Sequence, residues 1–163
     1  MSPISASMTE LPYGLAGKIY RSPLPFSPLF NPRGDLLEAF RQANVDRVVV
    51  LAEKAEMIDL TGRDMIKIYQ ELGIKVIEMP VVDFSIPEEE SFRQTVEETL
   101  EAAEDGETIV VHCHAGIGRT GMFTACMAKQ ALGLNGREAV DWVRQYVPEA
   151  VENPRQYQFV WDY

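Results

Sequence analysis

The chain's only two histidines flank one of its two cysteines in a short, glycine-containing stretch. Residues 112–121 have the sequence HCHAGIGRTG, with Cys113 between the histidines and Arg119 six positions later. Gly116 and Gly118 permit backbone angles and a close ligand approach that side chains would block. The amides of such a loop, the start of a following helix and a planar guanidinium all favour a bound phosphate. The pattern therefore predicts an anion-binding loop with a cysteine nucleophile at its base.

The same donors would stabilise the thiolate form of Cys113, which is the reactive form of a cysteine. Thr120, directly after Arg119, can donate a hydrogen bond to the sulfur when Cys113 leaves from a covalent intermediate. A cap in the first helical turn is an equally good interpretation of Thr120. Cysteines buried only for packing are common, but such a residue would need neither the two glycines nor the arginine.

A dinucleotide site is the main alternative, because residues 116–121 also match G-x-G-x-x-G between a strand and a helix. Such a site needs a further strand that ends in an acid about 20 residues later. Asp141 stands near that position, but it lies within the helical pattern AVDWVRQYV, and no strand follows it. The sequence therefore favours a phosphate loop.

Strands and helices alternate along the chain, and the loop lies at one of their junctions. Apolar, β-branched runs predict strands at residues 45–51, 74–79 and 108–112, with a shorter one at 18–21. Helices are predicted at residues 34–43, 53–72 with a break at 61–62, 85–105, 119–132, 135–147 and from 153 onward. We expect Thr61 to cap the second piece of the 53–72 helix and Ser85 to open the next helix with a capping box. The predicted fold class is α/β, with a mostly parallel central sheet of about four to five strands and helices on both faces.

The composition is that of an ordinary globular protein. The chain has 163 residues with 15 Lys+Arg and 25 Asp+Glu, so its formal charge is 15 − 25 = −10. This length predicts a single domain over residues 1–163, with residues 1–12 as a loose tail. The acidic balance argues against nucleic-acid and membrane partners, and no apolar run is long enough to span a bilayer. Two cysteines make no disulfide framework, so we expect a reduced, cytoplasmic setting. We also expect a monomer.

The loop sequence resembles the H-C-x5-R-[ST]-G signature of the cysteine-dependent protein tyrosine phosphatase superfamily. The resemblance extends over roughly residues 40–160, and the small size is similar to the dual-specificity branch, especially its compact archaeal and bacterial members. It implies a phosphatase-type three-layer sandwich and hydrolysis through a phosphocysteine, without metal or cofactor. Cys113 would be the nucleophile and His112 a supporting residue. The implied phosphate-binding residues are His114, Ala115, Gly116, Ile117, Gly118 and Arg119.

Hydrolysis of a phosphate monoester requires an acid that protonates the leaving oxygen. Residues 79–87, MPVVDFSIP, resemble the family's D-x-x-x-P acid loop, and the resemblance assigns the acid role to Asp83. Taken alone, an aspartate at this place is more often a turn or cap residue. Glu78 and Glu88 are weaker candidates, because a strand interior and a first helical turn would hold them away from the site.

In this superfamily a segment near the C-terminus positions the hydrolytic water. The corresponding segment here is AVENPRQYQF, residues 150–159. Glu152 stands where many tyrosine-specific members have their first glutamine, while Asn153 and Gln156 remain available. This departure leaves open which of the three residues orients the water. Taken by itself, Asn153 before a proline is better interpreted as a helix cap.

The resemblance implies a protein-tyrosine or dual-specificity phosphatase that acts on phosphotyrosine, and also on phosphoserine and phosphothreonine, in phosphorylated proteins or peptides. An inositol phosphate or phosphoinositide phosphatase is the first alternative, although inositide-directed relatives have additional loop lysines. A non-catalytic phospho-binding module is the second. A sulfurtransferase fits less well because it would need no acid loop. An arsenate reductase fits less well because it needs resolving thiols, and Cys126 is the only spare one. Arg21 is expected to lie near the site.

Acidic residues are concentrated upstream of the loop. Ten acids and one base, Arg93, lie between Asp83 and Glu107. Such a run predicts the solvated face of a helix. In a phosphatase, that face would favour substrates with basic residues close to the phosphorylated one.

Overall fold

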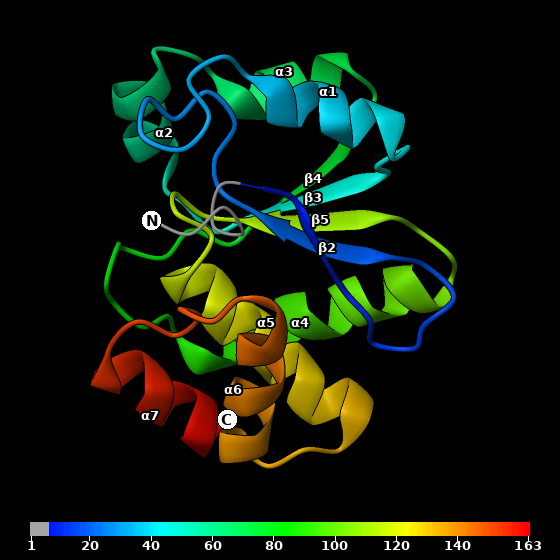
Figure 1. The fold of residues 1–163 in the computed structure, drawn as a ribbon, viewed down its shortest axis with the longest axis vertical. Helices are drawn as coiled ribbons and strands as arrows, with labels where there is room; N and C mark the ends of the chain where they lie inside the picture. The colour runs from blue at the N-terminus through cyan, green and yellow to red at the C-terminus, as the bar shows by residue number, and fades with distance from the viewer. Residues whose placement is uncertain (1–6) are drawn as a thin grey trace.

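A five-stranded sheet separates two groups of helices in the computed structural model of the chain, which describes residues 7–163 (Figure 1). The strands are β1 (Thr9–Leu11), β2 (Ile19–Ser22), β3 (Arg47–Val50), β4 (Lys75–Glu78) and β5 (Ile109–His112). The helices are α1 (Asp35–Gln42), α2 (Lys54–Thr61), α3 (Met65–Glu71), α4 (Glu89–Glu104), α5 (Gly118–Leu132), α6 (Gly136–Tyr146) and α7 (Pro154–Asp162). The predicted α/β fold class is confirmed.

The order of the strands in the sheet is β1-β2-β5-β3-β4. β1 runs antiparallel to β2, and every other neighbouring pair is parallel. β5 is therefore the central strand, flanked by β2 and β3, whose carboxyl ends lie at the same edge of the sheet. In open α/β sheets ligands bind at this edge, where connections diverge to opposite faces. The segment after β5 is the predicted phosphate loop.

Alternating residues of the central strands build two hydrophobic cores. Val49 and Val111 belong to the core beneath α4–α7, whereas Val48, Val50 and Val110 belong to the core beneath α1–α3. All five side chains are fully buried, as expected for a parallel sheet covered on both faces. Figure 1 shows these two helical layers on opposite sides of the sheet. Within residues 7–163, no helix has the length and apolar character needed to cross a bilayer.

Two predicted helix caps are wrong. Thr61 ends α2 and its hydroxyl donates back to Met57 O, while Asp64 caps α3 by accepting from the Lys67 amide. Ser85 does not open α4, because the carboxylate of Glu88 caps that helix instead. In each case another side chain nearby reached the free amides of the first turn. The cap predicted at Asn153 is confirmed, and Asn135 caps α6 by accepting from the Glu138 amide.

The prediction of a loose tail over residues 1–12 is wrong for part of that segment. Thr9–Leu11 form β1, which pairs with β2 along the edge of the sheet. A strand of three residues shows no periodicity in the sequence, and its partner lies in a segment predicted only as a short strand. The rest of that prediction, over residues 1–6, falls outside the residues that the structure describes.

Candidate active site

The loop after β5, residues 113–119, lies at the carboxyl edge of the sheet and is called here the cysteine loop. Ser22 of β2 and Val50 of β3 stand beside His112, the last residue of β5, so the loop emerges between two parallel neighbours. A pocket of about 190 Å³ opens over it. The pocket is lined by Leu29, Phe30, Asp83, Phe84, Cys113, His114, Ala115, Gly118, Arg119 and Glu152. Folding thus brings several of the predicted site residues into one pocket.

Cys113 lies buried at the base of this pocket, where its Sγ accepts a hydrogen bond from the Gly116 amide at 3.2 Å. Gly116 has φ +71°, in the left-handed region. A Cβ at Gly116 would also stand only 2.3 Å from Ser22 O and 2.4 Å from Arg21 Nη2. The turn therefore requires glycine on two separate grounds.

The helix that follows the loop presents free amides to the pocket. α5 begins at Gly118, and no side chain caps its N-terminus. The first amides of an α-helix have no acceptor within the helix, and its positive end attracts anions. In the part of the chain that the structure describes, the amides of His114, Ala115 and Ile117 also donate to no backbone carbonyl. The cysteine loop can therefore offer a ring of N–H donors to an oxyanion.

Arg119 is buried and held by Glu56 of α2, a residue that the sequence analysis missed. Its Nη1 and Nη2 donate to the two carboxylate oxygens of Glu56 at 2.8 and 2.7 Å, and Nη1 also donates to Val81 O at 2.9 Å. Burial alone would raise the pKa of Glu56, but the hydrogen bonds and charge of Arg119 outweigh it and hold that pKa below its ordinary value. Burial opposes the charge on Arg119 as well, yet Glu56 raises the guanidinium pKa overall.

The Nε of Arg119 is buried and has no acceptor among residues 7–163. Leaving such a donor unpaired costs about 1–3 kcal/mol, and more for a charged group. A phosphate oxygen in the adjacent pocket would satisfy it. Arg119 is thus fixed by Glu56 on one side and retains donor capacity for an anion.

Asp83 lies at the mouth of the pocket, with its carboxylate Oδ1 3.2 Å from Arg119 Nη2. Its side chain is 40% exposed, and Oδ1 also accepts from the Phe84 amide. Phe84 has φ +62°, an uncommon conformation for a bulky residue, and its carbonyl accepts from Asn153 Nδ2 at 3.1 Å. Asn153 thus holds the segment that presents Asp83.

The two other acid candidates lie away from the pocket. Glu88 caps α4 through the amides of Glu90 and Ser91. Glu78 is an exposed residue at the end of β4. Neither side chain lines the pocket, so Asp83 is the only one of the three predicted acids that does.

The two histidines have different environments. His112 is fully buried, and its Nδ1 lies 3.0 Å from Cys113 O while Nε2 lies 2.8 Å from the Tyr69 hydroxyl. Since a carbonyl can only accept, Nδ1 holds the proton and Nε2 accepts from Tyr69. Burial lowers the pKa of His112 to about 4, so the ring is neutral and supports the start of the loop. His114 is half-buried, with Nε2 3.0 Å from Ser27 Oγ.

Thr120 is buried behind the loop. Its Oγ1 has no hydrogen-bond partner within the described part of the chain. The Gly116 amide, rather than this hydroxyl, is bound to Cys113 Sγ. The role of Thr120 at the sulfur therefore stays a prediction.

Of the three residues proposed to position water, Glu152 lines the pocket and the other two hold it there. Its carboxylate packs against Gly118, where a Cβ would stand 2.1 Å from Oε1. Burial and the nearby charge of Asp83 raise the pKa of Glu152. Gln156 is buried and accepts from the Glu152 amide at 3.0 Å, while Asn153 caps α7 by accepting from the Gln156 amide.

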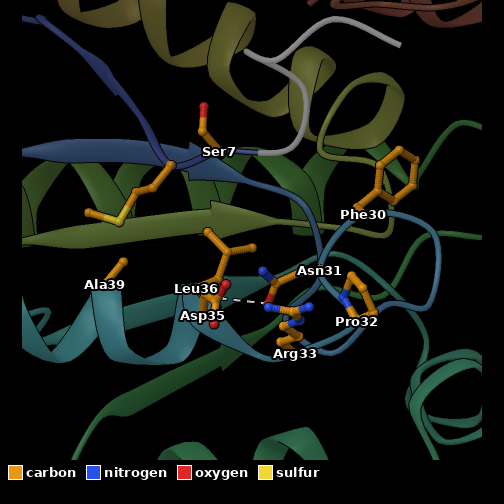
Figure 2. Close-up of a pocket in the computed structure, with 9 residues that line it drawn as sticks. Ser7, Phe30, Asn31, Pro32, Arg33, Asp35, Leu36 and Ala39 are labelled. Atoms are coloured by element: carbon orange, nitrogen blue, oxygen red, sulfur yellow. Dashed lines mark hydrogen bonds between the residues drawn. The ribbon is translucent and has the colours of Figure 1, made fainter.

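A second cavity, of about 550 Å³, lies beside α1 and shares Phe30 with the pocket over the cysteine loop. Figure 2 shows its wall, which includes Ser7, Arg33 and Asp35. None of the predicted site residues lines it. Elsewhere in residues 7–163, no cluster of three His, Cys, Asp or Glu side chains could hold a metal ion.

The protein family whose sequence model matches this chain is consistent with the geometry of the site. Residues 29–131, more than half of the 163-residue chain, match the family described as "Polymorphic toxin system, DSP-PTPase phosphatase". The chain belongs to this family. The resemblance to small dual-specificity members of the cysteine-dependent protein tyrosine phosphatases is therefore confirmed.

This phosphatase-family chain is similar to a curated relative and to one solved structure in sequence, and to a second solved structure in fold. It is 32% identical to the tyrosine-protein phosphatase CDC14 homolog of Schizosaccharomyces pombe over 91 residues, which are 56% of this chain but only 17% of that protein. The crystal structure of Tk-PTP in its active form has a TM-score of 0.78 at 26% identity and covers 99% of this chain and 97% of that one. A kinase-associated phosphatase structure has a TM-score of 0.85 at 18% identity, with 94% and 91% covered.

Proposed function

We propose that the chain, as one phosphatase domain over residues 1–163, hydrolyses phosphomonoesters through a phosphocysteine intermediate. The main support is that Cys113, Gly118 at the uncapped start of α5, Arg119 and Asp83 line one pocket, and that the Nε of Arg119 has no acceptor among residues 7–163. In the first step Cys113 Sγ attacks phosphorus, and the bond from phosphorus to the leaving oxygen breaks. Arg119 and the loop amides hold the other three oxygens while Asp83 gives its proton to the leaving oxygen.

In the second step, water attacks phosphorus and the phosphorus–sulfur bond breaks. Asp83, now ionised, takes the proton of the water, and Cys113 leaves as a thiolate. Thr120 and the Gly116 amide donate hydrogen bonds to the departing sulfur. Glu152 orients the water, since it is the one residue of its segment that lines the pocket.

The substrates that we propose are phosphorylated proteins or peptides, with phosphotyrosine preferred and phosphoserine and phosphothreonine accepted. Apolar side chains surround the mouth of the pocket, and two of them, Leu29 and Phe84, are 66% and 62% exposed. The aryl ring of phosphotyrosine would bury much more apolar surface against these side chains than the methylene of phosphoserine. The hydrophobic contribution to binding therefore favours phosphotyrosine. The loop positions that would hold lysines for an inositide are His114, Ala115 and Ile117.

A hydrolysis panel tests this proposal. Initial rates are measured with matched phosphotyrosyl, phosphoseryl and phosphothreonyl peptides and with inositol phosphates. Rapid acid quenching with a ³²P-labelled peptide would trap label on Cys113. We expect peptide turnover with the tyrosyl peptide fastest. Faster turnover of inositol phosphates would support the inositide alternative, and binding without turnover would support the non-catalytic module.

Asp83→Asn is expected to lower kcat by about 10²–10⁴-fold for a phosphoseryl or phenyl phosphate substrate, the usual range for general acid catalysis. The loss should be much smaller for an aryl phosphate whose leaving group needs no proton. Leaving-group dependence of kcat measures this difference. Glu78→Gln is the matched control, and an equal loss in that variant would mean that Asp83 is not the acid.

Glu152→Gln is expected to tighten inhibition by inorganic phosphate at neutral pH and to slow hydrolysis of the phosphoenzyme. The raised pKa of Glu152 determines the pH range in which the variant and the wild type should differ. Well below its ordinary value of 4.5 the carboxyl is neutral and the variant matches the wild type, whereas above the raised value its charge repels phosphate. Inhibition constants across pH and the pre-steady-state burst measure both effects. Asp141→Asn, with the same charge change on α6, should alter neither.

A further inference from the structure

Arg21 of β2 lies buried directly behind the cysteine loop. Its side chain is only 1% exposed, although arginine is rarely buried so completely unless it is paired. Its Nε donates to Gly116 O at 3.0 Å and its Nη2 to Ala115 O at 2.9 Å. Nη1 donates to the carbonyl of Ser7, a residue at the wall of the second cavity (Figure 2). One guanidinium therefore joins two consecutive loop carbonyls to the N-terminal segment.

The segment after β2 binds the next loop carbonyl as well. The Leu24 amide donates to His114 O at 2.8 Å. Three successive carbonyls, those of residues 114, 115 and 116, are thus all held from the β2 side. Neither Arg21 nor Leu24 is among the residues that line the pocket.

These contacts fix the direction of the loop amides. In a trans peptide the carbonyl of one residue and the N–H of the next point in opposite directions. Holding the carbonyls of residues 114–116 on the β2 side turns the amides of residues 115–117 toward the pocket. The Gly116 amide demonstrates the result, since it donates to Cys113 Sγ at 3.2 Å.

Arg21 also places a second positive charge close to the nucleophile. Burial lowers the pKa of Arg21 to about 10, and the nearby charges of Cys113 and Glu149 oppose that shift. The guanidinium is therefore protonated at neutral pH. Its neighbour Gly116 leaves room for it, because a Cβ there would stand 2.4 Å from Nη2.

We propose that Arg21 is a positioning residue that holds the cysteine loop in its anion-binding conformation before substrate arrives and stabilises the thiolate of Cys113. This proposal rests on the proposed function, because it concerns the same loop. Arg21 differs from Arg119 in that it does not line the pocket, so it acts on the site through the loop backbone and through its charge. Rotation of the peptide unit after Ala115 or Gly116 would remove both a donor facing the pocket and a hydrogen bond from the Arg21 guanidinium.

The test compares Arg21→Met and Arg21→Lys with the wild type. Three quantities are measured: the affinity for tungstate, the pH at which iodoacetamide modifies Cys113 half-maximally, and kcat and KM for a phosphotyrosyl peptide. We expect Arg21→Met to weaken tungstate binding at least tenfold, to shift alkylation to higher pH and to reduce kcat/KM about 10²-fold. Arg21→Lys keeps the positive charge but lacks the planar guanidinium that binds two loop carbonyls together. It should therefore retain the alkylation profile better than the tungstate affinity.

Arg47→Met is the matched control. Arg47 begins β3 at the amino edge of the sheet and pairs with Glu107 at 2.8 Å, so it is also a strand arginine, and its contacts are partly buried. Its replacement should lower the melting temperature without changing tungstate affinity or the alkylation profile. The same changes in Arg47→Met as in Arg21→Met would overturn the positioning role, because they would then reflect general destabilisation.

Chemical rescue tests separately whether the missing guanidinium group causes the loss of tungstate binding. Guanidinium at concentrations far below denaturing ones should restore tungstate binding to Arg21→Ala, whereas methylammonium should not. Wild-type tungstate affinity and alkylation in folded Arg21→Met would contradict the inference, and if that variant does not fold, Arg21→Lys decides it by the same readouts. A wild-type protein that binds tungstate but hydrolyses no phosphomonoester would contradict the proposed function and leave the loop assignment standing.

Discussion

Cys113→Ser is expected to reduce turnover of a phosphotyrosyl peptide by a factor on the order of 10⁴ or more while the protein still binds phosphopeptide. The loop amides and Arg119 favour an anion on the side chain at this position, and a thiol ionises far more readily than a hydroxyl. Serine is nearly isosteric, so the hydrogen bond from the Gly116 amide can persist. Phosphate release measures kcat, and titration calorimetry with the same peptide measures binding.

Cys126→Ser provides the control, because Cys126 is the chain's other cysteine and lies in the helix that follows the cysteine loop. Cys126 is fully buried in α5, and burial raises its thiol pKa. The new hydroxyl would lower the melting temperature, but kcat should stay close to that of the wild type. If Cys113→Ser kept kcat within tenfold of the wild type, or if Cys126→Ser lost turnover instead, the phosphocysteine mechanism would be wrong.

Local patterns were sufficient to predict the fold class and most of the elements, because each pattern covers residues that are close in the sequence. The VDRVVVL run predicts β3, and its alternate valines fill the two cores on either side of the sheet. The same argument applies to β5, which enters the HCHAGIGRTG segment directly. The spacing of Cys113 and Arg119 is local too, since one short turn and the start of α5 place both.

Residues that reach the loop from distant segments were much harder to predict. Glu56 is 63 positions from Arg119, and nothing in the sequence distinguishes it from Glu53 and Asp59 nearby. Its one signal is that it follows β3, the parallel neighbour of β5, so it emerges at the same edge of the sheet. Arg21 is 95 positions from Gly116, and its role depends on β2 pairing with β5. Strand order decides both contacts, and strand order is not a local pattern.

The acidic run also shows what a count of charges omits. α4 does present a solvated acidic face, but Glu98 and Glu107 pair with Arg47 at the amino edge of the sheet. Glu107 pairs with Lys75 there as well. Some of the negative charge in this run is therefore neutralised by basic residues, and these ion pairs lie at the edge of the sheet opposite to the pocket. The preference for basic peptides stays a prediction.

Arg119→Lys is expected to reduce kcat/KM for phosphotyrosyl peptides by about 10²–10⁴-fold. An ammonium has no fork with which to bind both oxygens of Glu56 and a phosphate together. Loss of two charge-assisted hydrogen bonds, at about 1.5–3 kcal/mol each, corresponds to that range at about 1.4 kcal/mol per tenfold. Arg93→Lys, in α4 and outside the set of residues that line the pocket, is the control and should have no effect on kinetics.

Glu56→Gln separates the two contributions of Arg119, namely its ion pair with Glu56 and its contact with phosphate. The guanidinium remains, but its position is held by a neutral amide, so we expect a loss in kcat/KM of about tenfold, well below that of Arg119→Lys. The pKa of Glu56 is lowered in the folded protein, so its contribution to stability is present above the ordinary value of 4.5 and is lost as pH falls through the lowered one. The melting temperature of Glu56→Gln should therefore lie below that of the wild type at pH 7 and approach it in acid. Equal kinetic losses in the two variants would mean that Arg119 contributes only through its pair with Glu56, and its assigned contact with phosphate would be wrong.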